Sequence, residues 1–207
     1  KRLGLQADYK LTNDSALGVT MNTISEEEGA DIVRQSFNYA GTRLKVSGSF
    51  QEIDKNFKSF KNLSDKEAAK WALQAGTRTS DIQLNYTGDI SADVALKRIS
   101  DDGGDISQRS FSIGNKQLKL TAGFSSVDAG FRTFRGLDDP KLASQSGTER
   151  SDIRLSFTPT TGIGADIGLL RITDDNGEAV KRSIALSDKR LRFSFSSQEV
   201  AKEFTHV

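Results

Sequence analysis

The chain has 207 residues, with 29 Lys and Arg against 28 Asp and Glu, so its formal net charge is +1. This balance argues against a general nucleic-acid binder, which would carry a large excess of positive charge. The chain contains no Cys, which excludes disulfides, thiolate metal sites and a cysteine nucleophile. Its one His is His206, and no apolar run approaches the length of a transmembrane helix.

Apolar and polar residues alternate along most of the chain, starting with Leu3, Leu5, Ala7, Tyr9 and Leu11. A period of two is typical of strands that have one apolar face. It predicts an all-β fold, an antiparallel up-and-down meander of about twelve strands. The expected strands are 3–11, 16–24, 33–40, 43–53, 81–87, 91–99, 107–113, 116–126, 152–158, 163–172, 181–186 and 189–197. Segment 65–75, between Ser64 and Gly76, predicts a short helix.

An internal repeat of about 73 residues organises these strands. The residues Phe50, Ile53, Asp54, Phe57 and Phe60 recur in the same spacing as Phe124, Val127, Asp128, Phe131 and Phe134. We interpret 1–207 as a single β domain made of a partial unit 1–32, units 33–106 and 107–179, and a partial unit 180–207. Because the outer units are incomplete, we expect the chain to belong to a longer repeat protein.

The links between the strands are of two kinds. Every other link is a tight turn, as at Asn13-Asp14, Gly41-Thr42 and Gly88-Asp89. The remaining links are acidic or long, and the two longest cover about 54–80 and 128–151. Alternate links of a meander fall at opposite ends of the sheet, so we expect tight turns at one end and long loops at the other.

In strand length, alternation and asymmetric links, the chain resembles a bacterial outer-membrane β-barrel of the porin-like kind. Aromatic residues support the resemblance. Near the tight turns, the apolar face carries Tyr9, Tyr39, Tyr86 and Phe157, and toward the other end it carries Phe50, Phe124 and Phe195. These residues would form two interfacial girdles. The resemblance implies a barrel or barrel segment in the bacterial outer membrane, acting as a channel or envelope anchor, with the lipid bilayer or lipopolysaccharide as partner.

A second hypothesis explains the same pattern differently. A charged content of 28% and a tandem repeat also fit an extracellular structural β-repeat, such as an adhesin or a fibre or surface-layer subunit. Its partners would be further copies of the repeat, and its apolar face would be buried against protein instead of lipid.

The polar face carries charges that recur with the repeat. The positive set comprises Lys45, Lys119 and Arg192, and the negative set comprises Asp81, Asp93, Asp152 and Asp166. Neighbouring strands of opposite charge can pair across the ladder. In a barrel these side chains would line the lumen and set ion selectivity, whereas on a soluble sheet they would be solvated cross-strand pairs.

Acidic turns and aromatic loop residues are the other candidates. The turns Asp101, Asp102, Asp105 and Asp174, Asp175, Glu178 offer oxygen ligands for Ca²⁺, although hairpin turns favour Asp in any case. We interpret Phe57, Phe60, Trp71, Phe131 and Phe134 as anchors that hold the long loops to the sheet.

Catalytic signatures are missing from the sequence. It contains no G-x-S-x-G, H-E-x-x-H or Walker pattern. We therefore expect a protein that is not an enzyme, that needs no cofactor and that binds no nucleic acid.

Overall fold

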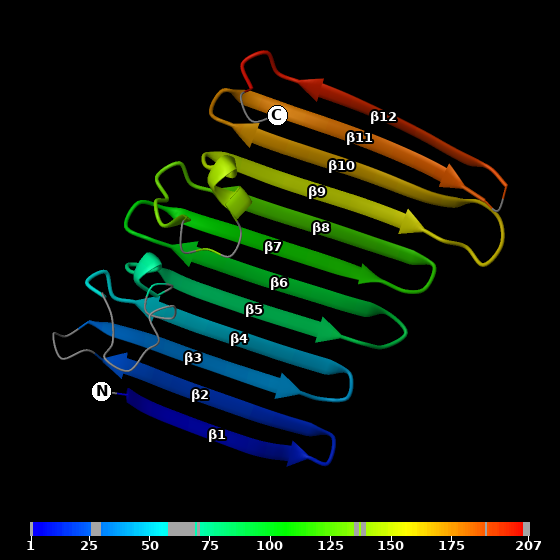
Figure 1. Cartoon of the computed structure of the whole chain (residues 1–207). Coiled ribbons are helices and arrows are strands. Elements are labelled where there is room, and N and C mark those ends of the chain that lie inside the picture. The colour runs from blue at the N-terminus through cyan, green and yellow to red at the C-terminus, as the bar shows by residue number, and fades with distance from the viewer. Residues whose placement is uncertain are drawn as a thin grey trace.

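The computed structural model describes residues 2–25, 30–57, 69, 71–134, 137, 140–188 and 190–204. Within these ranges, twelve strands form one antiparallel sheet in chain order (Figure 1). The strands are β1 (Arg2–Thr12), β2 (Ser15–Ser25), β3 (Asp31–Ala40), β4 (Leu44–Ile53), β5 (Arg78–Tyr86), β6 (Ser91–Ser100), β7 (Asp105–Gly114), β8 (Leu118–Val127), β9 (Thr148–Phe157), β10 (Gly164–Asp174), β11 (Gly177–Ser187) and β12 (Arg192–Val200). A 3₁₀-helix, η2, spans Pro140–Gln145. The predicted all-β, up-and-down meander is confirmed, and the sheet is open, because β1 and β12 are not paired with each other.

The predicted strand positions overlap all twelve observed strands, but three strands begin three or four residues earlier than expected. These are β5, β9 and β11, which start at Arg78, Thr148 and Gly177. The reason is that the first residues of these strands on the otherwise apolar face are charged, namely Arg78, Glu149 and Glu178. Apolar alternation therefore stops before the hydrogen-bonded ladder does.

The short helix predicted at 65–75 falls partly outside the described residues. Residues 71–73 are helical, and Gly76 has a φ of 82°, the left-handed conformation that commonly ends a helix. The Gly76 amide then donates to the Ile53 carbonyl at 2.9 Å, which returns the chain to the end of β4.

The turn end of the sheet is closed by backbone and Asx hydrogen bonds. The amides of Gly41 and Asn115 donate to the carbonyls of Leu44 and Leu118, both at 2.8 Å. The opposite end, called the loop end here, carries residues 54–77 and 128–147 between strands. Three links at the loop end are short, however, at 26–30, 101–104 and 175–176, so short and long links alternate there.

The register places one apolar face across the whole sheet. Directly paired residues share a face, and following the pairs from strand to strand gives a continuous apolar set. One member from each strand is Leu5, Leu17, Tyr39, Val46, Leu84, Val94, Phe111, Leu120, Leu155, Ile167, Ile184 and Phe193. We call this surface the apolar face. Phe195 lies one apolar position nearer the turn end than Phe50 and Phe124 do on their strands.

The apolar face has no second layer over it among the described residues. Large apolar side chains of inner strands stay open on it, and Ile82, for example, is 46% exposed. Toward the loop end the face becomes charged, with ion pairs such as Glu52–Arg78 at 2.8 Å and Arg171–Glu178 at 2.6 Å. The face is thus an apolar band with an ionic border on one side.

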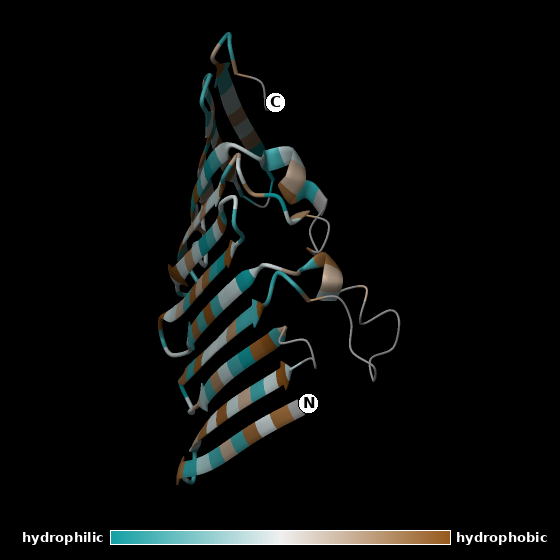
Figure 2. Cartoon of the chain, turned by 90° about the vertical axis from the view of Figure 1, so that its left-hand side faces the viewer, coloured by the Kyte–Doolittle hydropathy of each residue, from teal (hydrophilic) through white to brown (hydrophobic). Residues whose placement is uncertain are grey.

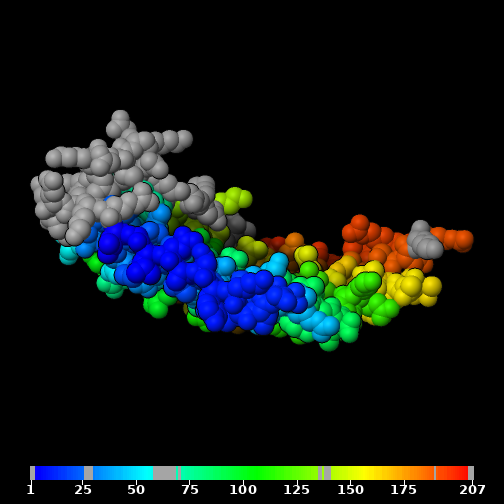
Figure 3. Space-filling model, turned by 90° about the horizontal axis from the view of Figure 1, so that it is seen from below, coloured from blue at the N-terminus to red at the C-terminus, as the bar shows by residue number. Residues whose placement is uncertain are grey.

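The opposite face is the one that the loops cover, and it is concave. Figure 2 shows the described loop segments on one side of the sheet, and Figure 3 shows the molecule as a shallow crescent that is hollow on that side. We call it the concave face. Between the turn end and the loops, its residues are mostly small or polar, such as Ser47, Ser49, Gln83, Ser110 and Thr121.

Burial is concentrated where the loops meet the concave face. One cluster contains Ala30, Ile32, Ile53 and Phe57, and the second contains Ile99, Ile106, Val127, Phe131 and Leu142. Each cluster joins strand ends to a loop that folds back over them. These are small satellite cores, and the middle of the sheet has no core of its own.

The register is staggered: a row of directly paired residues moves toward the loop end as it passes from β4 to β8. Val46 is the third residue of β4, and its row of direct partners passes through Leu84, Val94 and Phe111 to Ala122, the fifth residue of β8. A drift of two residues over four strands tilts the strands by roughly 20°, given rises of about 3.3 Å and spacings of about 4.8 Å.

Candidate functional site

The recurring charges all lie on the concave face, away from the buried clusters. Lys45, Lys119 and Arg192 are the second or first residues of β4, β8 and β12, so they lie close to the turn end. Asp93 and Asp166 lie at the same end on β6 and β10. The sheet therefore brings both signs of charge to one region of its polar surface.

Each lysine faces an uncharged side chain on the next strand. Lys45 pairs directly with Asn85, whose Nδ2 donates to Asp93 on the following strand. The cross-strand pairing predicted from sequence is therefore relayed over three strands instead of two.

A similar row of three side chains occurs on β8, β9 and β10, with a serine in place of the asparagine. Lys119 pairs directly with Ser156, whose Oγ donates to Asp166 Oδ1 at 2.5 Å. The order of cation, hydrogen-bonding side chain and carboxylate is thus shared by β4–β6 and β8–β10.

Asp81 and Asp152 lie farther from the turn end. Asp81 pairs directly with Ser49 on one side and Lys97 on the other. Asp152 lies 3.8 Å from Arg150 of its own strand. Both carboxylates therefore have a basic neighbour on the concave face.

Small side chains leave a depression beside the Lys45 row. Its volume is about 450 Å³, and Lys45, Asn85, Asp93, Gln83 and Ser110 are among the residues that line it. It is an open hollow that has a cation, Lys45, and a carboxylate, Asp93, in its lining.

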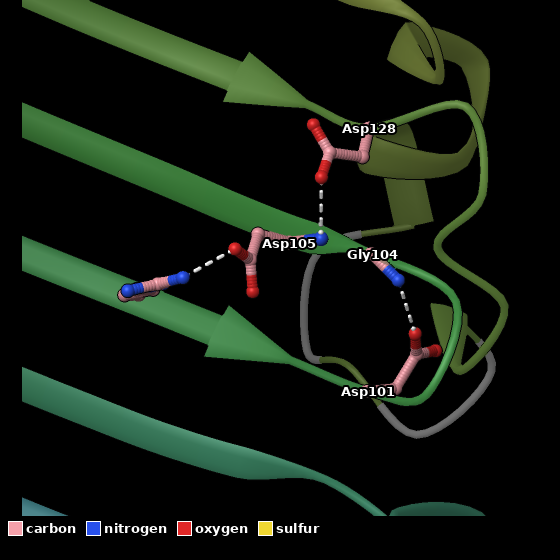
Figure 4. Close-up of polar contacts among 5 residues, drawn as sticks. Asp101, Gly104, Asp105 and Asp128 are labelled. Atoms are coloured by element: carbon pink, nitrogen blue, oxygen red, sulfur yellow. Dashed lines mark hydrogen bonds and ion pairs between the residues drawn. The ribbon is translucent and has the colours of Figure 1, made fainter.

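The acidic turn at 101–104 closes itself and holds the neighbouring loop. Asp101 Oδ1 accepts hydrogen bonds from the amides of Gly103 and Gly104, at 2.8 and 3.0 Å. Its Oδ2 accepts from the amides of Arg132 and Thr133 and from the Thr133 hydroxyl, at 2.8 to 2.9 Å. Figure 4 shows Asp101 directed at Gly104 in this turn.

These hydrogen bonds change the acidity of Asp101. Partial burial pushes the pKa of its carboxyl up, but the donors from Arg132, Gly103 and Thr133 together outweigh burial, and the net pKa lies below the ordinary value. Both oxygens are occupied by protein donors, so Asp101 acts as a loop organiser in this structure.

Glycine is required where this turn meets the loop after β8. A side chain on Gly103 would run into the backbone carbonyl of Gly130, and one on Gly104 would come within 2.7 Å of the Asp128 Cβ. The Asp105 amide also donates to Asp128 Oδ2 at 2.9 Å, as Figure 4 shows. The two links are therefore locked together at backbone level.

The other acidic candidates have protein partners of their own or lie on the surface of their turns. Asp105 pairs with Arg98, and Glu178 pairs with Arg171. Asp174 Oδ1 accepts from the amides of Asn176 and Gly177, each at 2.8 Å. Asp102 and Asp175 are exposed. No group of three or more potential metal ligands occurs among the described residues.

The aromatic candidates lie in the two satellite clusters. Phe57 is buried with Ile32 and Ile53, and Trp71 packs against the same cluster. Phe131 is buried in the other cluster and meets Phe134 edge-on, with ring centroids 4.9 Å apart. Phe60 lies outside the described residues.

The structure also reveals loop residues that the sequence reading missed. Thr77 and Thr148 are buried, and their hydroxyls donate to the carbonyls of Gln74 and Gln145, at 2.7 and 2.6 Å. The signal was present as a recurring Gln-x-Gly-Thr at 74–77 and 145–148. In addition, the Arg34 guanidinium lies 3.9 Å from the centre of the Trp71 ring.

Comparison with protein-family models, curated proteins and solved structures gives no match. In the described part of the chain, no helix has the length and apolar character needed to cross a bilayer. The function is therefore argued from the two faces of the sheet.

Proposed function

We propose that this chain is a non-enzymatic outer-membrane β-barrel, or a portion of one, that passes small polar solutes or anchors the envelope. The apolar face would contact lipid, and the concave face would line an aqueous lumen. The observation that carries the proposal is the uncovered apolar face, which runs through all twelve strands of a single layer. A soluble sheet normally covers such a face with a second layer.

The dimensions of the strands support this proposal. They are 9 to 11 residues long, which is the usual length of a membrane-spanning strand. On β8 the apolar positions run from Leu118 to Phe124, a distance of about 20 Å at 3.3 Å per residue. This approaches the apolar band of outer-membrane barrels, about 25 Å.

The ionic border and the curvature support it as well. Arginines such as Arg98 and Arg171 lie on the apolar face toward the loop end, where a long cationic side chain can reach lipid headgroups. The sheet bends toward its polar face, which is the sense of curvature that a water-filled barrel needs (Figure 3). Loops packed on that face would then narrow the lumen at one mouth.

The first test introduces a lysine on each face of the same strand. Ile82 lies on the apolar face of β5, and its neighbour Gln83 lies on the concave face. In lipid, Ile82→Lys is expected to destabilise the protein by about 2–4 kcal/mol, whereas Gln83→Lys should have little effect. Reversible unfolding by urea in vesicles measures both.

The competing function, an extracellular structural repeat, predicts a different outcome. Such a protein would stay monodisperse and rich in β structure in plain buffer, and Ile82→Lys would leave its solubility intact or improve it. Gel filtration without detergent, with circular dichroism of the peak, is the check. A sharp folded peak would overturn the barrel proposal.

A further inference from the structure

The two edges of the sheet are its least covered apolar surfaces. β1 and β12 lie at opposite margins of the sheet (Figure 1). On the apolar face, Tyr9 of β1 is 66% exposed and Leu191 beside β12 is 71% exposed, whereas Tyr86 of the inner strand β5 is 38% exposed. The difference arises because each edge strand has a neighbour on one side only.

The β12 edge repeats a sequence that is paired elsewhere in the sheet. Leu191-Arg192-Phe193 matches Leu44-Lys45-Val46 at the start of β4 and Leu118-Lys119-Leu120 at the start of β8. The two inner copies pair with the following strands, β5 and β9. The corresponding side of β12 is unpaired among the described residues.

The β1 edge repeats the partner of that sequence. Residues 5–9 read Leu-Gln-Ala-Asp-Tyr, matching Ile-Gln-Leu-Asn-Tyr at 82–86 and Ile-Arg-Leu-Ser-Phe at 153–157. In the inner copies the last, aromatic residue pairs directly with the leucine of the preceding strand, as Tyr86 with Leu44 and Phe157 with Leu118. β1 thus has the sequence of a strand that accepts a β4-type neighbour.

We infer that β12 of one copy of this chain pairs antiparallel with β1 of a second copy, in the register that joins β4 to β5 and β8 to β9. Leu191 then lies opposite Tyr9, Arg192 opposite Asp8 and Phe193 opposite Ala7. The partner that fits each edge is the other edge of the same sheet.

Charge supports this register. At the inner junctions the cation faces Asn85 or Ser156, and the carboxylate lies one strand farther on. At the new junction the carboxylate of Asp8 lies directly opposite the Arg192 guanidinium. Asp8 accepts a hydrogen bond from Gln6 at 2.8 Å, which orients it on the concave face.

Side-chain size supports it too. Phe193 is larger than Val46 and Leu120 of the inner copies, and it would meet Ala7, which is smaller than their partners Leu84 and Leu155. A large side chain therefore faces a small one. The inference does not rest on the proposed function, because the same edges would pair in a membrane or in water.

Cysteine cross-linking of the full chain tests the inference, since the protein has no Cys of its own. Single variants Gln6→Cys and Ser194→Cys, which the register places opposite each other, are mixed and oxidised, one of them carrying a mass tag. Ala7→Cys with Phe193→Cys is the second pair, because adjacent ladder positions alternate between wide and narrow spacing. Lys10→Cys with Ser194→Cys is the control, four residues out of register on the same face.

We expect a cross-linked dimer that contains one tagged and one untagged chain from at least one in-register pair, at least tenfold above the Lys10→Cys control. Arg192→Glu should reduce the yield, and Asp8→Lys combined with Arg192→Glu should restore it. Equal yield from the control, no dimer from either pair, or only an intrachain disulfide in the Gln6→Cys/Ser194→Cys double variant would each overturn the inference. Measurements in detergent and in plain buffer separate this result from the fate of the barrel proposal.

Discussion

At the scale of single residues, the carboxylate of Asp101 accepts five hydrogen bonds. It joins its own turn to the loop after β8 through Gly103, Gly104, Arg132 and Thr133. Hydrogen bonds to a charged acceptor are stronger than neutral ones, typically about 1.5–3 kcal/mol each in net terms. The hydrogen bonds of one side chain therefore hold the 101–104 turn and the loop after β8 together.

Replacing Asp101 should weaken the protein in a pH-dependent way. Its folded pKa is lowered, so the stabilisation is complete above the unfolded value of about 3.9 and is lost as the pH falls through the folded pKa. Asp101→Asn should lower the free energy of unfolding by about 1–3 kcal/mol at pH 7 and flatten its decline below pH 4. Chemical unfolding between pH 7 and pH 3 measures this.

The neighbouring Asp102 provides the control for that experiment. It is exposed, and Asp102→Asn should change the free energy of unfolding by less than about 0.5 kcal/mol. Equal losses in the two variants would contradict the role given to Asp101.

At the scale of elements, the strands that reach a satellite cluster have one end in a buried environment and the other on the apolar face. The loop end of β7 contributes Ile106 to a buried cluster, and its turn end contributes Ile113 to the apolar face. Ile106 is 1% exposed and Ile113 is 37% exposed. The two isoleucines of β7 therefore differ in role: Ile106 packs under the loop, and Ile113 forms part of the exposed apolar face.

Truncating each isoleucine to alanine should show that the two side chains contribute differently to stability. Ile106→Ala leaves a cavity under the loop and should cost about 2–5 kcal/mol, while Ile113→Ala should cost about 1 kcal/mol or less. Thermal unfolding and limited proteolysis of the loop at 128–147 report the two effects. Similar losses from both variants would mean that the cluster does not hold the loop.

Strand identity could be predicted from the sequence because alternation is a local property. The charged starts of β5, β9 and β11 hid three strand ends, since Arg78, Glu149 and Glu178 interrupt the apolar pattern. The exact partners of the lysines could not be predicted. Register depends on how many residues each turn consumes, and a shift of four residues would exchange Asn85 for Asp81 opposite Lys45.

At the scale of the whole molecule, the alternation of polar and apolar residues gives the sheet two faces of opposite character. The polar and small residues of the concave face alternate with the apolar residues of the other face on every strand. A tilt of roughly 20° is shallower than the 35–45° usual in barrels. Each strand therefore runs nearly straight from the turn end of the sheet to the loop end.

Reversing charge on the concave face should alter conduction if the sheet belongs to a channel. Lys45→Glu with Lys119→Glu should shift the reversal potential of single channels toward cation selectivity, because both residues would face the lumen. Lys45→Gln with Lys119→Gln should produce an intermediate shift. Planar bilayers under a salt gradient provide the measurement, and identical potentials for all three proteins would contradict a luminal location.

The four-strand period of the register has an evolutionary consequence. Four is an even number, so duplicating or deleting one period keeps every later strand in its original direction and every turn on its original side. Each such event would change the width of the sheet by about 19 Å, at about 4.8 Å per strand, without a new turn or a new strand pairing. Gain or loss of a single strand would instead invert everything that follows it. Recombination between copies can therefore change the width of this sheet without disturbing the direction or the turns of the remaining strands.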